Sequence, residues 1–340
     1  MEKTMRAMVL DKFGGAEQAS LQLREVPAKT AGPGQVVAAV QAAALNRRDV
    51  WIRLGKYGGI KLPTILGSDG AGVVAAVGAG VPQSLLGQEV VINPGVGWGD
   101  NPVAQSKTYR ILGMPDDGTY AEQVVVAAAS VVPKPAHLSW AEAAALPLAG
   151  LTAYRALCTR GQVRSGQTVV IPGIGSGVST MVLMLAKHLG ARAIVTSSSP
   201  DKLLAARAMG ADFGVDYRQP DWDQQILKYC GGSLPDLAVD GAGGDSWGKL
   251  VGLMAPGGTI VSYGATAGVS GIDLRKLYWK QLNILGSTMG TDRDFEQLVA
   301  LVAAGQLRPR IDSVLPLEQA AQAHHRMEHS EQLGKIVLQM

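Results

Sequence analysis

A glycine-rich segment carries the first recognisable chemistry in this sequence. The stretch Gly173-Ile-Gly-Ser-Gly177 follows an apolar run at 168–171 and precedes a helical pattern over 178–189. Glycines placed in this way allow a tight turn and let backbone amides approach a pyrophosphate at a helix N-terminus. Ser179 stands where a third glycine would be, and a plain strand-to-helix turn needs similar glycines, but the flanking strand, helix and second strand favour a dinucleotide. The predicted cofactor contacts are Gly173, Gly175, Ser176, Gly177 and Val178.

The end of the second predicted strand distinguishes NADPH from NADH. Proteins that bind NAD place Asp or Glu about 20 residues after the glycines, where it binds the ribose 2′-hydroxyl. Here that position is filled by Ser197 and Ser198, and Lys202 follows one helical step later. A carboxylate would repel a 2′-phosphate, whereas hydroxyls and an ammonium bind it, with about 1.5–3 kcal/mol for each charge-assisted hydrogen bond. The same stretch also suits a helix cap at Asp201, and because both roles are compatible we predict NADPH.

The composition restricts the class of protein. The chain has 340 residues, 47% of them apolar, and a net charge of +3, so we expect two folded domains rather than a disordered chain. Two Cys residues cannot form a disulfide framework, which is typical of a reducing compartment, and we predict a cytoplasmic protein. The basic residues are scattered along the chain, so we predict no nucleic-acid partner. The N-terminus lacks a signal-like apolar region and the apolar stretches are short, so we predict no membrane partner.

Two kinds of element must position the glycine segment. Short apolar runs bounded by Gly and Pro fill the first part of the chain, which indicates a partly open β-barrel. A capping box of Ser139 and Glu142 then begins a helical pattern, after which strands alternate with helices, as in a doubly wound parallel sheet. We therefore predict an α/β fold in which a dinucleotide-binding domain, 129–307, is inserted into a barrel domain formed by 1–128 and 308–340. The predicted parallel strands are 168–171, 193–196, 237–239, 259–262 and 282–285.

Several motifs, in this order along the chain, resemble the medium-chain dehydrogenases/reductases and, within them, the zinc-independent quinone oxidoreductases. The resemblance covers nearly the whole chain and implies a GroES-like barrel joined to a Rossmann domain. A set of motifs in one order is far more specific than any single motif. Besides the glycine segment, the motifs are 46–49, 67–74, 146–154, 210–217, 239–244 and 334–338.

The resemblance also implies further cofactor contacts. Tyr217 would join the serines and Lys202 around the 2′-phosphate, and Thr152 would lie near the nicotinamide. The ends of three later strands would contact the nicotinamide ribose and carboxamide, although ordinary strand-end turns have a similar composition. Ligands bind at the carboxyl ends of parallel strands, which favours the cofactor interpretation. These positions are Ala242, Tyr263, Gly264, Ala265, Ser287 and Met289.

A catalytic zinc is not expected. Alcohol dehydrogenases of this family hold zinc through a Cys, a His-Glu pair and a further Cys or Asp, and the resemblance places these positions at Asn46, at Ser68 with Asp69, and at about Leu148. Neither Asn nor Leu is an ordinary zinc ligand, and Asp69 alone cannot make a site that needs three protein ligands. The stretch 93–117 keeps the length of the family's structural-zinc lobe but contains no Cys. We therefore predict no metal.

Without a Lewis acid, the hydride acceptor must be activated by hydrogen bonds and by its own electrophilicity. Quinones and α,β-unsaturated carbonyls meet this requirement better than unactivated alcohols or ketones. We predict Asn46 and Tyr57 as catalytic residues that orient or polarise the acceptor oxygen, with the proton coming from Tyr57 or water. Tyr57 and Trp51 are predicted to line the substrate pocket, although a surface Tyr and a core Trp account for them equally well, and Asn46 also suits a turn.

Other functions remain open from the sequence. One is an enoyl-thioester reductase on the same scaffold, a second is a zinc-type alcohol dehydrogenase, and a third is a non-catalytic NADPH-binding sensor or RNA-binding protein. The low net charge and the lack of a basic-aromatic stripe count against RNA. The resemblance implies a homodimer. A tetramer remains an alternative, because the stretch 93–117 keeps the length of the family's structural-zinc lobe. The expected small-molecule partner is a quinone or enone substrate.

Overall fold

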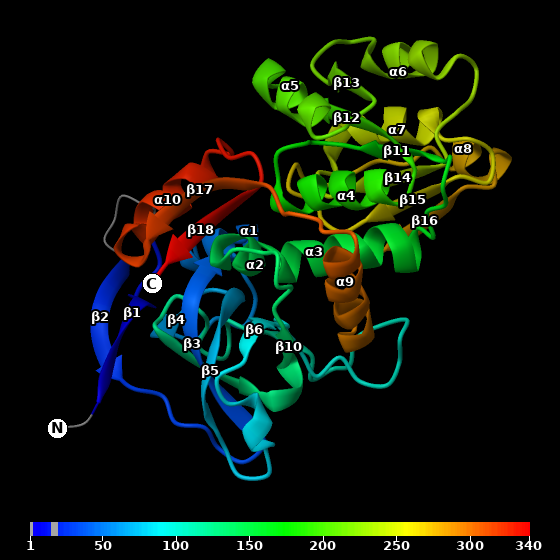
Figure 1. Cartoon of the computed structure of the whole chain (residues 1–340). Coiled ribbons are helices and arrows are strands. Elements are labelled where there is room, and N and C mark those ends of the chain that lie inside the picture. Colours follow the sequence, from blue (N-terminus) through cyan, green and yellow to red (C-terminus); the bar gives the residue numbers. More distant parts are fainter. Residues whose placement is uncertain (1–2, 15–19) are drawn as a thin grey trace. The chain divides into compact units, whose positions relative to one another are not determined.

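The computed structural model describes residues 3–14 and 20–340, and the chain divides into two compact units. The first unit consists of Met1–Ala149 together with Thr291–Met340, and the second of Gly150–Gly290. The first unit contains the blue and cyan strands as well as the red C-terminal elements, so that the two ends of the sequence share one unit (Figure 1).

The main sheet of the first unit joins strands from both ends of the chain. Its strands are β3 (Gln35–Ala44), β5 (Asp69–Val77), β6 (Glu89–Ile92), β9 (Gln123–Ala127), β10 (Val131–Pro133), β17 (Ile311–Pro316) and β18 (Lys335–Gln339). Their order is β10-β6-β5-β3-β18-β17, and β9 also pairs with β3. Strand β18 is antiparallel to β3, with Val337 opposite Ala44, which brings the last motif of the sequence beside the motif that begins at Asn46.

Smaller elements complete the first unit. One small sheet has the order β2-β1-β4, and two further strands pair with each other. Side chains of the main sheet, of the β2-β1-β4 sheet, of two helices and of connecting segments form one core, in which Leu45, Ile52 and Ile336 are fully buried. The strands are β1 (Thr4–Leu10), β2 (Leu21–Pro27), β4 (Thr64–Ile65), β7 (Gly95–Val96) and β8 (Arg110–Ile111), and the helices are α1 (Arg47–Arg53), α2 (Trp140–Ala145), α9 (Asp292–Ala304) and α10 (Ala320–Glu328).

The second unit is built on a parallel sheet. Its strands are β11 (Thr168–Ile171), β12 (Arg192–Ser197), β13 (Phe213–Asp216), β14 (Leu237–Asp240), β15 (Thr259–Ser262) and β16 (Asn283–Gly286). Their order, β13-β12-β11-β14-β15-β16, is the doubly wound arrangement expected from the sequence, with all neighbours parallel. The helices between them are α4 (Gly177–His188), α5 (Pro200–Ala208), α6 (Trp222–Cys230), α7 (Trp247–Leu253) and α8 (Leu274–Trp279).

The helical segment after residue 139 confirms one expectation and refines another. The Ser139 N–H donates to Glu142 Oε2 at 2.8 Å, and Ser139 Oγ accepts from the Glu142 N–H at 3.3 Å, which is the expected capping box. The helical pattern that begins here is divided into two helices, because Pro147 begins a second one, α3 (Pro147–Tyr154). Proline has no N–H to continue a helix but fits the first helical position. A π-helical turn, Arg155–Arg160, follows.

The compact units divide at different positions from the predicted domain limits. Residues 129–149 and 291–307, which we assigned to the dinucleotide-binding domain, belong to the first unit by their packing. Helix α2 contacts β3 and β5, and Asn93 Nδ2 donates to Asp292 Oδ1 at 2.7 Å. In the described part of the chain, no helix combines the length and the apolar character that crossing a bilayer requires.

Candidate functional site

The glycine segment connects β11 to α4, as the sequence indicated. Gly173 and Gly175 have φ values of 66° and 141°, which residues with a Cβ rarely adopt. Ser176 is the N-cap of α4, and its Oγ accepts a hydrogen bond from the Ser179 N–H at 3.0 Å. The first amides of a helix have no partner within the helix, so the first turn of α4, which begins with Gly177 and Val178, can receive an anion.

Ser179 explains how the segment departs from the usual glycine spacing. Its side chain is fully buried, and Oγ accepts a hydrogen bond from the Gly175 N–H at 3.2 Å. The same oxygen lies 3.1 Å from the Ser176 carbonyl oxygen. A hydroxyl therefore ties the turn to the start of the helix at the position where a third glycine would allow close packing.

The residues predicted around the 2′-phosphate lie at the ends of β12 and β13. The Tyr217 N–H donates to the Ser197 carbonyl oxygen at 3.3 Å, and Ser197 Oγ accepts from the Ser199 N–H at 3.1 Å. Ser199 is the N-cap of α5 and accepts from the Lys202 N–H at 3.3 Å. The prediction that Asp201 caps this helix was therefore wrong: Ser199 Oγ reaches the free amide, and Asp201 lies in the first turn.

An arginine that the sequence analysis did not single out lies at the same edge. The Arg218 guanidinium binds the Asp216 carboxylate, with Nε 3.0 Å from Oδ1 and Nη2 2.6 Å from Oδ2. These hydrogen bonds and the charge of Arg218 lower the pKa of Asp216. Asp216 is opposite Ser197 in the register of β13 and β12. An acidic residue next to the proposed phosphate position is therefore masked by a basic one.

A buried carboxylate and a tyrosine shape the ends of β14 and β15. Asp240 is fully buried, and Oδ2 accepts from the Gly243 N–H at 2.9 Å and from Trp247 Nε1 at 2.7 Å. The Tyr263 ring lies so close to Gly241 that any Cβ at that glycine would collide with it. The Tyr263 hydroxyl hydrogen-bonds the Ser176 side chain, and burial raises the pKa of Tyr263 far above its ordinary value. Sequence reasoning missed Asp240, although an acid that ends a strand before 241–244, a run of Gly and Ala, is a detectable pattern.

The remaining predicted cofactor residues lie in the same unit, Thr152 on α3 and the others at or just after strand ends. Ala242 follows β14, Gly264 and Ala265 follow β15 just after Tyr263, and the Ser287 N–H donates to the Ser262 carbonyl oxygen at 2.8 Å. Thr152 Oγ1 lies 3.9 Å from Met289 Sδ, and both residues are buried.

Ser287 contributes an independent sign that a polar ligand belongs here. Within the described residues, its Oγ is buried and has no hydrogen-bond partner. A buried hydroxyl without a partner is costly unless a ligand or water satisfies it. Together with the positive-φ glycines and the N-terminus of α4, this hydroxyl makes the second unit fit a bound dinucleotide.

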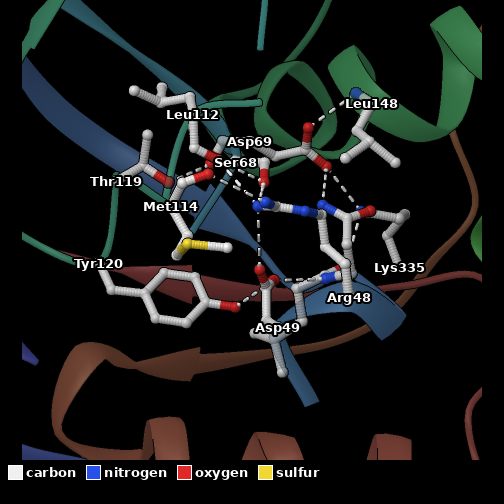
Figure 2. Close-up of polar contacts among 12 residues, drawn as sticks. Arg48, Asp49, Ser68, Asp69, Leu112, Met114, Thr119, Tyr120, Leu148 and Lys335 are labelled. Carbon is white, nitrogen blue, oxygen red and sulfur yellow. Dashed lines mark hydrogen bonds and ion pairs between the residues drawn. The ribbon is translucent and has the colours of Figure 1, made fainter. Parts of the chain in front are cut away.

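A compact polar cluster is buried in the first unit around Asp69 (Figure 2). Lys335 Nζ lies 2.7 Å from Asp69 Oδ2, 2.8 Å from Asn46 Oδ1 and 2.6 Å from the Leu45 carbonyl oxygen. Asn46 Nδ2 donates to Asp69 Oδ2 at 2.9 Å, and the Leu148 N–H donates to Asp69 Oδ1 at 2.7 Å. Lys335 and Asp69 are 2% and 0% exposed, so this ion pair is fully removed from solvent.

A second layer of polar residues surrounds this cluster. Asp49 Oδ2 accepts hydrogen bonds from the Asn46 N–H and from the Tyr120 hydroxyl, both at 2.9 Å. Burial raises the pKa of Asp49, and Arg48, whose Nη1 lies 3.9 Å from Asp49 Oδ1, opposes this rise. Burial, with the charge of Asp49, also raises the pKa of Tyr120. Arg48 Nη1 in turn donates to Ser68 Oγ at 2.6 Å, so the network continues to the residue beside Asp69.

Of the three residues predicted around the acceptor, Asn46 and Tyr57 contact the polar residues described above. Asn46 is the N-cap of α1, so its backbone begins a helix while its side chain turns to Asp69 and Lys335. The Tyr57 ring lies 5.2 Å from the Arg48 guanidinium carbon and packs against the core of the unit. Trp51 is half-buried on α1, and Lys56 Nζ lies 5.9 Å from its ring centroid.

The cluster does not fit a zinc ion. Asn46 and Asp69 turn their oxygens toward an ammonium group, and Leu148 contributes a backbone N–H instead of a ligand. Zinc requires about three protein ligands from Cys, His or acidic side chains. Among residues 3–14 and 20–340, no group of three or more such side chains is placed to hold a metal. Lys335 was missed as a site residue because its partners are remote in sequence, although the motif 334–338 contains it.

Comparisons with known proteins agree with this organisation. Residues 32–136 match the family model described as an alcohol dehydrogenase GroES-like domain, and residues 177–304 match the model described as a zinc-binding dehydrogenase. The chain is 31% identical to a protein named quinone oxidoreductase from Pseudomonas aeruginosa, over 96% of this chain and 97% of that protein. These matches confirm the expected GroES-like barrel and the resemblance to quinone oxidoreductases.

Solved structures show the same fold. A crystal structure named NAD-dependent alcohol dehydrogenase is 41% identical, with a TM-score of 0.93, and the alignment covers 99% of this chain and 100% of that one. A structure of the crotonyl-CoA carboxylase/reductase AntE in complex with NADP is 25% identical, with a TM-score of 0.90 and coverage of 99% and 95%. The expected combination of a GroES-like barrel with a Rossmann sheet is confirmed.

Proposed function

Because the chain belongs to the medium-chain dehydrogenase/reductase family of oxidoreductases, we propose that it is a zinc-independent enzyme that uses NADPH to reduce a quinone or an α,β-unsaturated carbonyl compound. The observation that carries this proposal is the buried contact of Lys335 with Asp69 and Asn46. This contact occupies the positions that the family resemblance assigns to zinc ligands. An acceptor that reacts without a Lewis acid must be electrophilic by itself, as quinones and enones are.

The choice of NADPH is supported by the edge formed by β12 and β13. Ser197, Ser198 and Lys202 stand where a carboxylate would select NADH, and Tyr217 with Arg218 adds an aromatic ring and a guanidinium. Arginine and lysine bind phosphate, whereas an acid at this edge would repel it. The NADP complex of a structural relative supports the same choice, and the relative named as NAD-dependent makes a direct measurement necessary.

Residues of the second unit would hold the cofactor. The segment 173–178 would bind the pyrophosphate, and Thr152, Ala242, Tyr263, Ser287 and Met289 would surround the nicotinamide half, with backbone at Gly264 and Ala265. The bound cofactor supplies a hydride, which is its essential chemistry.

Residues of the first unit would act on the acceptor. Hydride addition to the β-carbon of an enone places negative charge on the carbonyl oxygen, and an N–H of the Asn46 amide would stabilise that oxygen. Tyr57 or water would then deliver one proton, so the acceptor gains a hydride and a proton in total. Arg48 holds the Tyr57 ring by its contact at 5.2 Å, and Trp51 would line the pocket.

The decisive experiment measures NADPH and NADH oxidation with a panel of quinones, enals and enoyl thioesters, with and without a chelator. We expect turnover with NADPH and an activated acceptor, and no effect of the chelator. A clear preference for enoyl thioesters would establish the second candidate, an enoyl-thioester reductase, which the AntE relative favours. Chelator-sensitive alcohol oxidation would contradict the proposal, as would NADPH binding without turnover of any acceptor, which is the behaviour of a sensor.

A homodimer is the proposed assembly, in a cytoplasmic setting. Strand β16 is an edge of the parallel sheet, and helix α8 before it exposes Tyr278 and Trp279 at 67% and 83%. An open strand edge beside exposed aromatic side chains suits pairing with a second copy of the same sheet. Light scattering after size-exclusion chromatography distinguishes the dimer from the alternative tetramer and from a monomer.

A further inference from the structure

The last motif of the chain brings a lysine into the interior of the first unit. Gly334 has a φ of 102°, and a Cβ at this position would collide with the Arg310 carbonyl oxygen. This glycine lets the chain turn tightly into β18, whose first residue is Lys335. The Lys335 side chain then extends to the start of α1, where it is 2% exposed.

Every hydrogen of the Lys335 ammonium has a protein acceptor. An ammonium group has three N–H donors and no acceptor, and here the three acceptors are the Leu45 carbonyl, Asn46 Oδ1 and Asp69 Oδ2. The group therefore has no donor left for a substrate oxygen. The ammonium neutralises Asp69 and orients Asn46, but unlike a metal ion it has no open position at which a substrate oxygen could bind.

The ammonium determines which way the Asn46 amide points. Lysine accepts no hydrogen bond and a carboxylate donates none, so the amide oxygen must face Lys335 and the amide nitrogen must face Asp69. The opposite orientation would place the NH₂ group against the ammonium and the oxygen against the carboxylate. One N–H of Asn46 is used by Asp69, which leaves the other as the donor for a further oxygen.

We propose that Lys335 is a positioning residue of the active site: as an internal cation bound to Asp69, it takes the place of a metal ion and fixes the Asn46 amide so that one N–H is directed to the acceptor oxygen. The role toward the acceptor rests on the proposed function, whereas the cluster itself does not. A cation with no free coordination position cannot polarise a carbonyl or an alcohol directly. The consequence for specificity is that the cluster polarises the acceptor only through the Asn46 N–H, so the acceptor must already be electrophilic.

Three variants test this role: Asn46→Ala, Lys335→Met combined with Asp69→Asn, and all three changes together. The Lys335→Met/Asp69→Asn pair removes both charges at once, which avoids leaving a buried carboxylate unpaired. Lys134→Met is the matched control, because Lys134 is another lysine of the first unit whose side chain is only 6% exposed, with Nζ 2.8 Å from the Leu138 carbonyl oxygen and 3.1 Å from Glu89 Oε2.

The first measurement, hydrogen exchange of the Asn46 side-chain amide by NMR, does not depend on enzymatic activity. The chain has four asparagines, so ¹⁵N-asparagine labelling yields few side-chain amide signals, and Asn46→Ala identifies the one in question. We expect the Asn46 amide protons to exchange slowly in the natural protein and at least about tenfold faster in the Lys335→Met/Asp69→Asn variant, because the amide then loses its charged partners. In Lys134→Met they should remain slow. Unchanged exchange in the charge-free variant would overturn the positioning role.

The second measurement, the kcat of the variants, tests whether Lys335 acts on the acceptor through Asn46. Asn46→Ala should lower kcat by about 100-fold, as expected for the loss of one oxyanion donor, and Lys335→Met/Asp69→Asn by about 10-fold or more. The combined variant should be no worse than Asn46→Ala, because both changes remove the same interaction. Multiplicative losses would contradict the inference. If the natural protein turns over no acceptor, the proposed function fails, and the amide exchange still decides whether Lys335 orients Asn46.

Discussion

Arg218→Ala is expected to weaken the use of NADPH and to leave the use of NADH nearly unchanged. In the structure Arg218 is 59% exposed and Asp216 is 20% exposed, and the two side chains share hydrogen bonds of 2.6–3.1 Å. Removing the guanidinium has two consequences. It takes away a donor for the 2′-phosphate, and it uncovers the Asp216 carboxylate at the same edge of the sheet.

The size of the effect follows from the exposure of these groups. Loss of a charge-assisted hydrogen bond weakens binding by about 10-fold or more, and because Arg218 is exposed the low end of this range applies. Repulsion between the uncovered carboxylate and the phosphate weakens binding by a further few-fold in water. Together these effects predict a rise of about 30-fold in the KM for NADPH.

Steady-state kinetics with both cofactors, at low and high salt, measures this effect. Asp216→Asn/Arg218→Ala is the matched control, because it removes the carboxylate together with the guanidinium and should recover the part caused by repulsion. Added salt should reduce the same part, since exposed charges are screened. Equal changes in the KM for NADPH and NADH, or no change in either, would refute the assignment of this edge to the 2′-phosphate.

Three further results are expected. Lys335→Met alone should lower the melting temperature by about 10 °C because it leaves Asp69 buried and unpaired, whereas Lys335→Met/Asp69→Asn should recover most of this loss in a calorimetric scan. Burial lowers the pKa of His324 from 6.5 to about 3. Between these pH values His324 is protonated in the unfolded chain but not in the folded one, so the stability of the fold decreases as the pH drops below about 6.5. In an acid titration, His324→Gln should lose stability less steeply than the natural protein. Trp279→Asp should convert a dimer to monomers in light scattering at equal concentration, and an unchanged mass would exclude α8 from the interface.

Local pattern was sufficient for most of the elements and for the parallel character of the second sheet, whereas β13 was not among the predicted strands. Apolar runs at 168–171 and 259–262 became β11 and β15 with the same limits, and the capping box at Ser139 forms as expected. Alternating strands and helices imply parallel crossovers, so a doubly wound parallel sheet follows from the sequence, and the structure supplies the order of its strands. Hydrophobic periodicity and capping act over a few residues, which is why these features are readable without a structure.

The limits of the units and the partners of buried charges depend on tertiary packing. Residues 129–149 resemble the start of the helical domain in composition, but α2 packs on strands of the barrel unit. Similarly, Lys335 and Asp69 are 266 residues apart, among 31 basic and 28 acidic residues that offer many other pairs.

The sequence by itself therefore determined the family resemblance, the glycine segment, and the serines at the strand end where proteins that bind NAD have an acidic residue. Only the folded chain decided that β18 pairs with β3, and this pairing brings Lys335 to Asn46 and Asp69. The physical reason is that the energy of a buried charge depends on which groups surround it in space, and strand pairing sets those groups across long distances in sequence.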